Sequence, residues 1–248
     1  MACDGSGARN SILSPLAARH SCARLRSPGD ISCQLFGLFD NPRVYVLTNT
    51  VSDAAVESLS ERETAVLTKV VGKRKREFAT ARGLAREGLE RFFDVRGFDL
   101  LNAEDRSPIW PTGIEGSISH SNTRAWVALV DATFGTIGID GEERKDLQQD
   151  LWHLTLLDRE VTYLETLDAS IRGRRALTIF SAKEALYKAQ YPRSGSFMGY
   201  MSLHVELSEA GSLRCTFQQA AGPFSIGFVA HGRWLDENEI VTSVWIPR

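Results

Sequence analysis

The chain has 248 residues, which favours one large domain or two small ones with a substantial hydrophobic core. Its composition, 43% hydrophobic and 24% charged, is typical of a soluble globular protein. The formal net charge of −2 gives no electrostatic reason for the whole chain to bind nucleic acid. No apolar run approaches the ~20 residues that a membrane-spanning helix needs.

Residues 1–40 are expected to form an N-terminal extension that is partly disordered or packed on the first half of the protein. They lack the continuous apolar stretch of a secretory signal, so we expect a cytoplasmic protein. A transit peptide is the alternative, because the first 26 residues contain one acid and four arginines: Asp4, Arg9, Arg19, Arg24 and Arg26. Free thiols in a reducing compartment are indicated by four cysteines without metal-ligand spacing: Cys3, Cys22, Cys33 and Cys215.

The first part of the chain shows a strand pattern followed by a helix pattern. Residues 43–50 alternate and are rich in β-branched side chains, which predicts a strand. Ser60 and Glu63 have the spacing of a capping box, so a helical region is expected to begin there. This region runs to about residue 93, with Gly72 as a candidate break.

A loop and two strands are expected next. The loop is predicted at 106–113 from its two prolines and its glycine. The stretches 125–131 and 136–140 have the composition of strands. We expect these two strands to pair with each other around a turn at 132–135.

The second part of the chain is predicted to be helical first and then strand-like. One helix is expected over 154–167 and a stronger one over 174–190, ended by Pro192. The tail from 203 to 248 alternates again and contains glycine turns. This order indicates an α+β fold of two halves, each a helix packed on a small antiparallel sheet, with the join near residue 143.

The stretch TIGIDGEERKD at 136–146 ends a predicted strand with two carboxylates on one face. Ile137 and Ile139 are spaced two apart, as expected for one buried face, and Asp140 and Glu142 follow with the same spacing. Like charges held this close raise the free energy unless a positive group lies between them. The pattern therefore indicates a positive group at this strand end.

The predicted helix at 174–190 places Glu184 on its apolar face, with Lys188 one turn further on. Two interpretations stay open. Glu184 and Lys188 form an ordinary ion pair on a helix flank, or Glu184 meets Asp140 and Glu142 around a divalent ion. Three carboxylates without histidine or cysteine favour Mg²⁺ over Zn²⁺, with Mn²⁺ as a substitute, and Mg²⁺ favours a phosphorylated substrate.

Cationic side chains that suit such a substrate are concentrated between residues 69 and 96. This stretch holds nine basic and four acidic residues, and Arg82 lies on the border of its apolar stripe. The segment GSISHS at 116–121 is expected to be a turn whose backbone N–H groups bind phosphate together with a charged His120. A hydrogen-bonded structural histidine is the alternative for His120.

Four segments together resemble the 4′-phosphopantetheinyl transferases of the surfactin type, in particular the branch that serves siderophore synthetases. The segments are GKRKREFATAR, RSPIWPTGIEGSISHS, IGIDGE and FSAKEALYKA, in family order and spacing. The resemblance implies two similar α/β halves in a pseudo-two-fold arrangement, with coenzyme A in the cleft between them. Residues 41–143 would bind coenzyme A, and residues 144–248 would carry the catalytic helix and dock a carrier protein.

The implied reaction is transfer of 4′-phosphopantetheine from coenzyme A to a serine of an apo acyl, peptidyl or aryl carrier protein, with release of 3′,5′-ADP. Such enzymes serve nonribosomal peptide, siderophore and polyketide synthesis, and a monomer is expected. A non-catalytic module that binds coenzyme A or carrier proteins is the alternative. A third reading is a Mg²⁺-dependent hydrolase of nucleotide pyrophosphates.

The resemblance also implies roles for particular residues. Asp140, Glu142 and Glu184 would hold Mg²⁺ on the pyrophosphate of coenzyme A. Glu184 would help to deprotonate the carrier serine, directly or through a water, and Lys188 would neutralise charge on the phosphates and the leaving group. His120, with Ser119, would contact the 3′-phosphate of coenzyme A. Around the coenzyme, the other contacts would come from Asp140 and Lys188 and from the basic residues Arg74, Arg82 and Arg106. The family usually has Ile or Val where this chain has Gly141, so substitution of Gly141 by Ile is expected to keep or raise activity.

Overall fold

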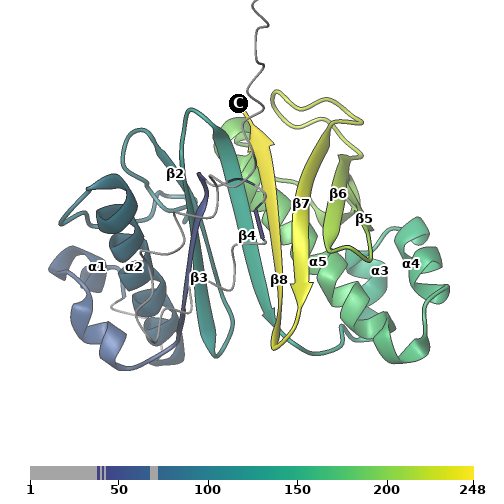
Figure 1. Cartoon of the computed structure of the whole chain (residues 1–248), viewed down its shortest axis with the longest axis horizontal. Coiled ribbons are helices and arrows are strands. Elements are labelled where there is room, and N and C mark those ends of the chain that lie inside the picture. The colour runs from purple at the N-terminus through teal and green to yellow at the C-terminus, as the bar shows by residue number, and fades with distance from the viewer. Residues whose placement is uncertain (1–37, 40, 42, 68–71) are drawn as a thin grey trace, which may run out of the picture. The chain divides into compact units, whose positions relative to one another are not determined.

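A computed structural model describes residues 38, 39, 41, 43–67 and 72–248 (Figure 1). The predictions made for residues 1–37, including the extension and three of the four cysteines, lie outside the described residues. The remaining cysteine, Cys215, is a buried free thiol. Within the described part of the chain, no helix is long and apolar enough to cross a membrane.

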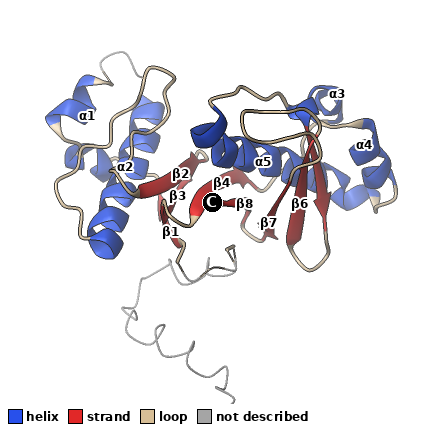
Figure 2. Ribbon diagram, turned by 90° about the horizontal axis from the view of Figure 1, so that it is seen from above, coloured by secondary structure: helices blue, strands red, loops and turns tan. Residues whose placement is uncertain are grey.

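The first half is a three-stranded antiparallel sheet with a long helix packed on it. The strand order is β1-β3-β2, with β1 at Tyr45–Thr50, β2 at Ile114–His120 and β3 at Arg124–Asp131. Helix α2 (Gly72–Phe93) covers one face of this sheet (Figure 2). Apolar residues of α2 and of the three strands share one buried cluster, which includes Leu89 of α2.

The start of the first helical region follows the predicted capping box. The 3-10 helix η4 (Ala54–Ser58) precedes α1 (Glu61–Ala65). Ser60 accepts a hydrogen bond from the backbone N–H of Glu63, and the Glu63 carboxylate accepts one from the N–H of Ser60. The prediction of a helix starting here is therefore confirmed.

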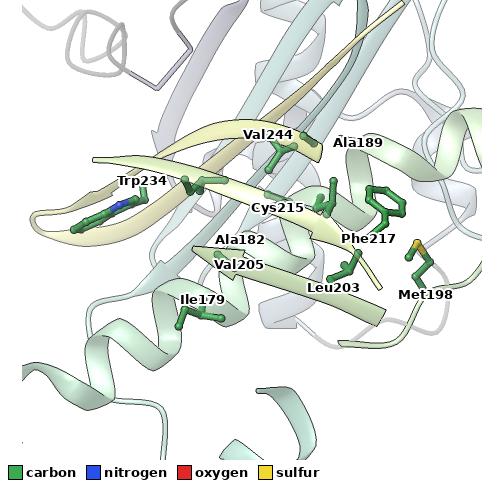
Figure 3. Packing of buried hydrophobic residues seen from close by; sticks show 14 of the residues in the cluster. Ile179, Ala182, Ala189, Met198, Leu203, Val205, Cys215, Phe217, Trp234 and Val244 are labelled. Carbon is green, nitrogen blue, oxygen red and sulfur yellow. The ribbon is translucent and has the colours of Figure 1, made fainter. Parts of the chain in front are cut away.

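The second half is a five-stranded antiparallel sheet with order β4-β8-β7-β6-β5. Its strands are β4 (Gly135–Glu143), β5 (Leu203–Leu207), β6 (Ser212–Phe217), β7 (Val229–Asp236) and β8 (Glu239–Pro247). Helix α5 (Ala169–Ser194) packs along this sheet, and Figure 3 shows Ala182 and Ala189 of α5 in the buried cluster with Val244 of β8. Each half is thus a helix on an antiparallel sheet, which confirms the α+β architecture expected from the sequence.

The expected pairing of strands 125–131 and 136–140 is wrong. Both segments are strands, but β4 pairs with β8 and not with β3. The reason is that β3 is the central strand of its sheet, so β1 and β2 already occupy both of its edges. Beyond the turn, Gly135 adopts φ 134°, and the chain enters the second sheet.

The helices of the second half differ from the predicted ranges in two places. The helix expected over 154–167 is divided into α3 (Trp152–Thr155) and α4 (Asp158–Glu165), after the 3-10 helix η5 (Gln149–Leu151). The break arises because Leu157 is extended and serves as the N-cap of α4.

Helix α5 does not end at Pro192. It includes this proline in its last turn and ends at Ser194, with Gly195 as the C-cap in the left-handed φ of 60° that glycine favours. The 3-10 helix η6 (Tyr200–Ser202) then leads into β5.

Candidate active site

The site is built where α5 lies against β4. A Cβ atom at Gly138 of β4 would lie 1.8 Å from the carbonyl oxygen of Ala185, so only glycine allows this close approach. The facing side of α5 carries small buried residues, among them Ala182 and Ala189. The resulting contact between strand and helix brings the side chains of α5 to the end of β4.

Asp140 lies at the centre of this contact and accepts three hydrogen bonds. Its Oδ1 accepts from Ser119 Oγ of β2 at 2.8 Å and from Lys188 Nζ of α5 at 2.7 Å. Its Oδ2 accepts from Ser181 Oγ of α5 at 2.8 Å. Lys188 Nζ also donates to the carbonyl oxygen of Ile139 at 3.2 Å. With Asp140 only 5% exposed, these donors compensate the cost of burying its charge.

Lys188 therefore pairs with Asp140, across the contact between helix and strand. Of the two interpretations open for the motif, a simple Glu184–Lys188 pair on one helix flank is not what the structure shows. Glu184 accepts instead from the hydroxyl of Tyr200 at 2.6 Å. Burial, followed by the hydrogen bond to Glu184 and the charge of Glu184, raises the pKa of Tyr200, which keeps this hydroxyl a donor.

The three predicted carboxylates influence one another electrostatically. Burial, followed by the charge of Asp140, raises the pKa of Glu142 to about 7, and Glu184 adds to this shift. Such a set of oxygen donors suits a hard divalent cation, which would relieve the repulsion. Among the described residues, however, no three His, Cys, Asp or Glu side chains are arranged closely enough to hold a metal. Lys188 supplies the positive charge at Asp140 in this structure.

Two serines join the sheets next to Asp140. The backbone N–H of Ile139 donates to Ser117 Oγ at 3.0 Å, and that of Gly141 donates to Ser119 Oγ at 3.2 Å. The two serines of β2 thus accept hydrogen bonds from backbone N–H groups at the edge of β4 that pairs with no other strand among the described residues. The prediction of a turn at 116–121 is wrong, because residues 116–120 lie in β2. This segment contributes the side-chain hydroxyl groups of Ser117 and Ser119 to the site.

His120, at the end of β2, belongs to a second cluster with Arg74 and Glu77 of α2. His120 Nε2 contacts the Arg74 guanidinium, and His120 Nδ1 lies 3.4 Å from Glu77. Burial and the charge of Arg74 lower the pKa of His120 to about 4, which favours a neutral imidazole near neutral pH over the charged donor expected from the sequence. The positive charge here is that of Arg74, whose side chain is 56% exposed.

Arg82 and Arg106, the other predicted basic residues, lie in different surroundings. Arg82 is 4% exposed, stacks on Phe78 at 4.3 Å and donates to Asn102, and burial lowers its pKa to about 10. It is held in the interior of the first half. Arg106 lines a pocket of about 770 Å³, and the same pocket is bordered by Lys188.

This pocket lies between the loop that starts at Asp105 and the last turns of α5. Its wall is partly aromatic, with Trp110, Tyr187 and Tyr191. The Tyr191 hydroxyl donates to Asp105 at 2.8 Å, which ties the loop to the helix. The pocket therefore offers flat apolar surfaces together with the positive charges of Arg106 and Lys188.

Sequence reasoning missed several residues of this arrangement. Ser181 lies seven positions before Lys188 on the same helix face, so helical periodicity gave a usable signal for it. Tyr200 and Tyr191 follow the recognised motifs in sequence. The contact of Tyr200 with Glu184 depends on how the chain after α5 folds back onto this helix, and the contact of Tyr191 with Asp105 depends on how a distant loop reaches the last turn of α5. No local sequence pattern predicts either contact.

Comparison with known proteins places the chain in a family. The model of the 4′-phosphopantetheinyl transferase N-terminal domain matches residues 61–130, and that of the 4′-phosphopantetheinyl transferase superfamily matches residues 136–244. The two matched ranges together include α2, α5 and most of both sheets, but not β1 of the first sheet. The chain belongs to the 4′-phosphopantetheinyl transferase superfamily.

Curated relatives agree with this assignment. The chain is 33% identical over 141 residues to 4′-phosphopantetheinyl transferase Npt of Nocardia iowensis, covering 56% of this chain and 62% of that protein. It is 35% identical over 147 residues to 4′-phosphopantetheinyl transferase Svp of Streptomyces mobaraensis, covering 58% of each. It is 34% identical over 135 residues to enterobactin synthase component D of Escherichia coli strain K12, covering 52% of this chain and 61% of that protein. The matches thus span about three fifths of the length of these relatives.

Proposed function

We propose that this protein transfers 4′-phosphopantetheine from coenzyme A to a serine of an apo carrier protein and releases 3′,5′-ADP. The observation that carries the proposal is the ion pair of Asp140 and Lys188 at the β4–α5 contact, with Glu184 one turn before Lys188 on α5 and a pocket of about 770 Å³ bordered by Lys188. Membership in the transferase superfamily supports this reaction over a non-catalytic binding module.

The residues of the cluster fit the needs of this reaction. In the transfer, the serine oxygen bonds to the phosphorus that carries pantetheine, and the bond from this phosphorus to the 3′,5′-ADP oxygen breaks. Glu184 would accept the serine proton, directly or through a water, and Lys188 would face the charge that develops on 3′,5′-ADP. The ligands proposed for Mg²⁺, or for Mn²⁺ in its place, are Asp140, Glu142 and Glu184, which would have to lie closer together than they do in this structure to hold the ion. The cation, when bound, would neutralise charge on the pyrophosphate.

The remaining predicted residues would bind the coenzyme around this centre. Arg74, with the neutral His120 beside it, would meet the 3′-phosphate, and Arg106 would contact coenzyme A from the pocket wall. Ser119 would act through Asp140, to which it donates. Arg82 would support the fold of α2 beneath these groups, since it is buried.

The likeness to enterobactin synthase component D favours carrier proteins of nonribosomal peptide and siderophore synthesis as substrates. We extend the proposal to a cytoplasmic monomer with a first half that binds coenzyme A and a second half that docks the carrier. The strand β4, which carries Asp140 and Glu142, is then counted with the second half, because it belongs to the second sheet.

The proposal is tested by measuring the release of 3′,5′-ADP from coenzyme A in the presence of Mg²⁺. The measurement is made with and without a panel of apo acyl, peptidyl and aryl carriers. We expect release only when a carrier with an intact acceptor serine is present, and none with a carrier in which this serine is alanine. Release without any carrier would instead indicate a pyrophosphate hydrolase. Coenzyme A binding without release would indicate a binding module.

Substitution of Glu184 by Gln is expected to lower turnover about 10²-fold while the fold survives, because the amide cannot accept the serine proton. Calorimetric unfolding and steady-state transfer rates measure the two effects. Tyr200→Phe is the matched control, since it removes only the hydroxyl that donates to Glu184. We expect it to cost far less turnover, and a Glu184→Gln variant with near-normal turnover would exclude Glu184 as the base.

A further inference from the structure

The indole of Trp126 in β3 packs directly against the backbone of Gly141 in β4. A Cβ atom at Gly141 would lie 2.5 Å from both Cε3 and Cζ3 of Trp126, which is far inside van der Waals contact. Trp126 is 1% exposed and is enclosed by a buried cluster with residues from both sheets, so it has little room to move. The expectation that isoleucine is tolerated at Gly141 is therefore wrong for this chain.

Gly141 lies between two of the proposed ligands but faces the other way. Successive residues of a strand point to opposite faces, so Gly141 faces Trp126 while Asp140 faces Ser181 and Lys188 of α5. The space that a larger residue at 141 would fill is occupied by the indole. The two positions are thus complementary in size across the junction of the two sheets.

The contact lies beside the hydrogen bonds that hold Asp140. Ser119 of β2 is paired with Trp126 in the register of the first sheet. The same serine accepts from the N–H of Gly141 at 3.2 Å and donates to Asp140 Oδ1 at 2.8 Å. A group that pushed β4 away from Trp126 would lengthen both bonds and shift the Asp140 carboxylate.

We propose that Trp126 and Gly141 are positioning residues, matched in size, that set the distance of β4 from the first sheet and thereby place Asp140 for catalysis. Neither residue touches the reacting atoms. The consequence for turnover rests on the proposed function. The structural consequence, displacement of Asp140, does not depend on it.

The test compares Gly141→Val with the double variant Trp126→Val/Gly141→Val. We expect crystal structures of Gly141→Val to show Asp140 displaced from Ser119 and Lys188, and kcat for carrier modification to fall about 10²-fold, as a misplacement near 1 Å can cause. The double variant removes the indole and is expected to restore both bonds to Asp140 and most of the lost kcat. Gly141→Ala replaces Gly141→Val in the same comparison if the valine variant does not fold.

Gly88→Val in α2 is the matched control for a general loss of stability. A Cβ at Gly88 would lie 2.6 Å from Leu129 and 2.9 Å from Leu47, so this variant is also overpacked, but in the core of the first half. We expect it to lower the melting temperature without moving Asp140. An unchanged Asp140 in Gly141→Val, or a double variant with no recovery, would overturn the proposal. If the wild-type protein modifies no carrier, the proposed function fails, and the crystal structures still decide this inference.

Discussion

An Asp140→Asn variant is expected to lose about 10³-fold in the rate of carrier modification, the largest effect on activity of any single change in the site. Asp140 accepts from Ser119, Ser181 and Lys188, so its charge organises groups from both sheets and from α5. Asparagine keeps the shape but removes this charge, and its amide cannot accept from all three donors. Lys188 would then lose its charged partner, and the proposed metal site would lose an anionic ligand.

Steady-state kinetics with intact-mass detection of the modified carrier measures this effect. Ser181→Ala is the matched control, because it removes one donor to Asp140 Oδ2 and leaves the carboxylate charged. We expect this variant to lose about 2 kcal/mol of transition-state stabilisation, the contribution of one hydrogen bond to a charged group, which is less than the loss expected for Asp140→Asn. Turnover of Asp140→Asn within a few fold of wild type would show that Asp140 is not part of the catalytic centre.

A Lys183→Met variant is expected to lose about 3–5 kcal/mol in the free energy of unfolding. Lys183 Nζ lies 2.6 Å from Glu160, and the two side chains are 0% and 1% exposed. Lys183 also donates to the carbonyl oxygen of Thr155 at 2.8 Å, while Glu160 accepts from the N–H of Val205 at 2.7 Å. The pair therefore fastens α4 and β5 to α5, and methionine would leave a buried carboxylate without its cation.

Urea denaturation followed by circular dichroism gives the free energy of unfolding for this variant. The double variant Glu160→Gln/Lys183→Met is the control, because it removes both charges of the pair. We expect the double variant to be more stable than Lys183→Met alone. Equal stability of Lys183→Met and wild type would refute the structural role assigned to this lysine.

The sequence predicted the parts of the site that depend on local pattern. Alternation along 136–142 placed Asp140 and Glu142 on one face of a strand, and helical periodicity placed Glu184 and Lys188 together on α5. Which groups then meet depends on the crossing of α5 over β4 at Gly138, where the backbones touch. Pairing of Lys188 with Asp140 is a result of that crossing and could not be derived from spacing within the helix.

Long-range contacts also explain the predictions that were wrong. The short connection between segments 125–131 and 136–140 favours the pairing of these two strands. This pairing fails because β1, far back in the sequence, occupies the edge of β3 opposite β2. Similarly, Gly141 looks like a weak point within its own strand, yet it is required by Trp126, which lies fifteen positions earlier in another sheet.

The most direct test of the proposed activity is the intact mass of an apo carrier protein after incubation with this protein, coenzyme A and Mg²⁺. We predict that the carrier gains the mass of one phosphopantetheine group, and that it gains nothing when its acceptor serine is alanine or when the metal is chelated. Unchanged masses for acyl, peptidyl and aryl carriers, from a folded protein that binds coenzyme A, would contradict the proposed transfer.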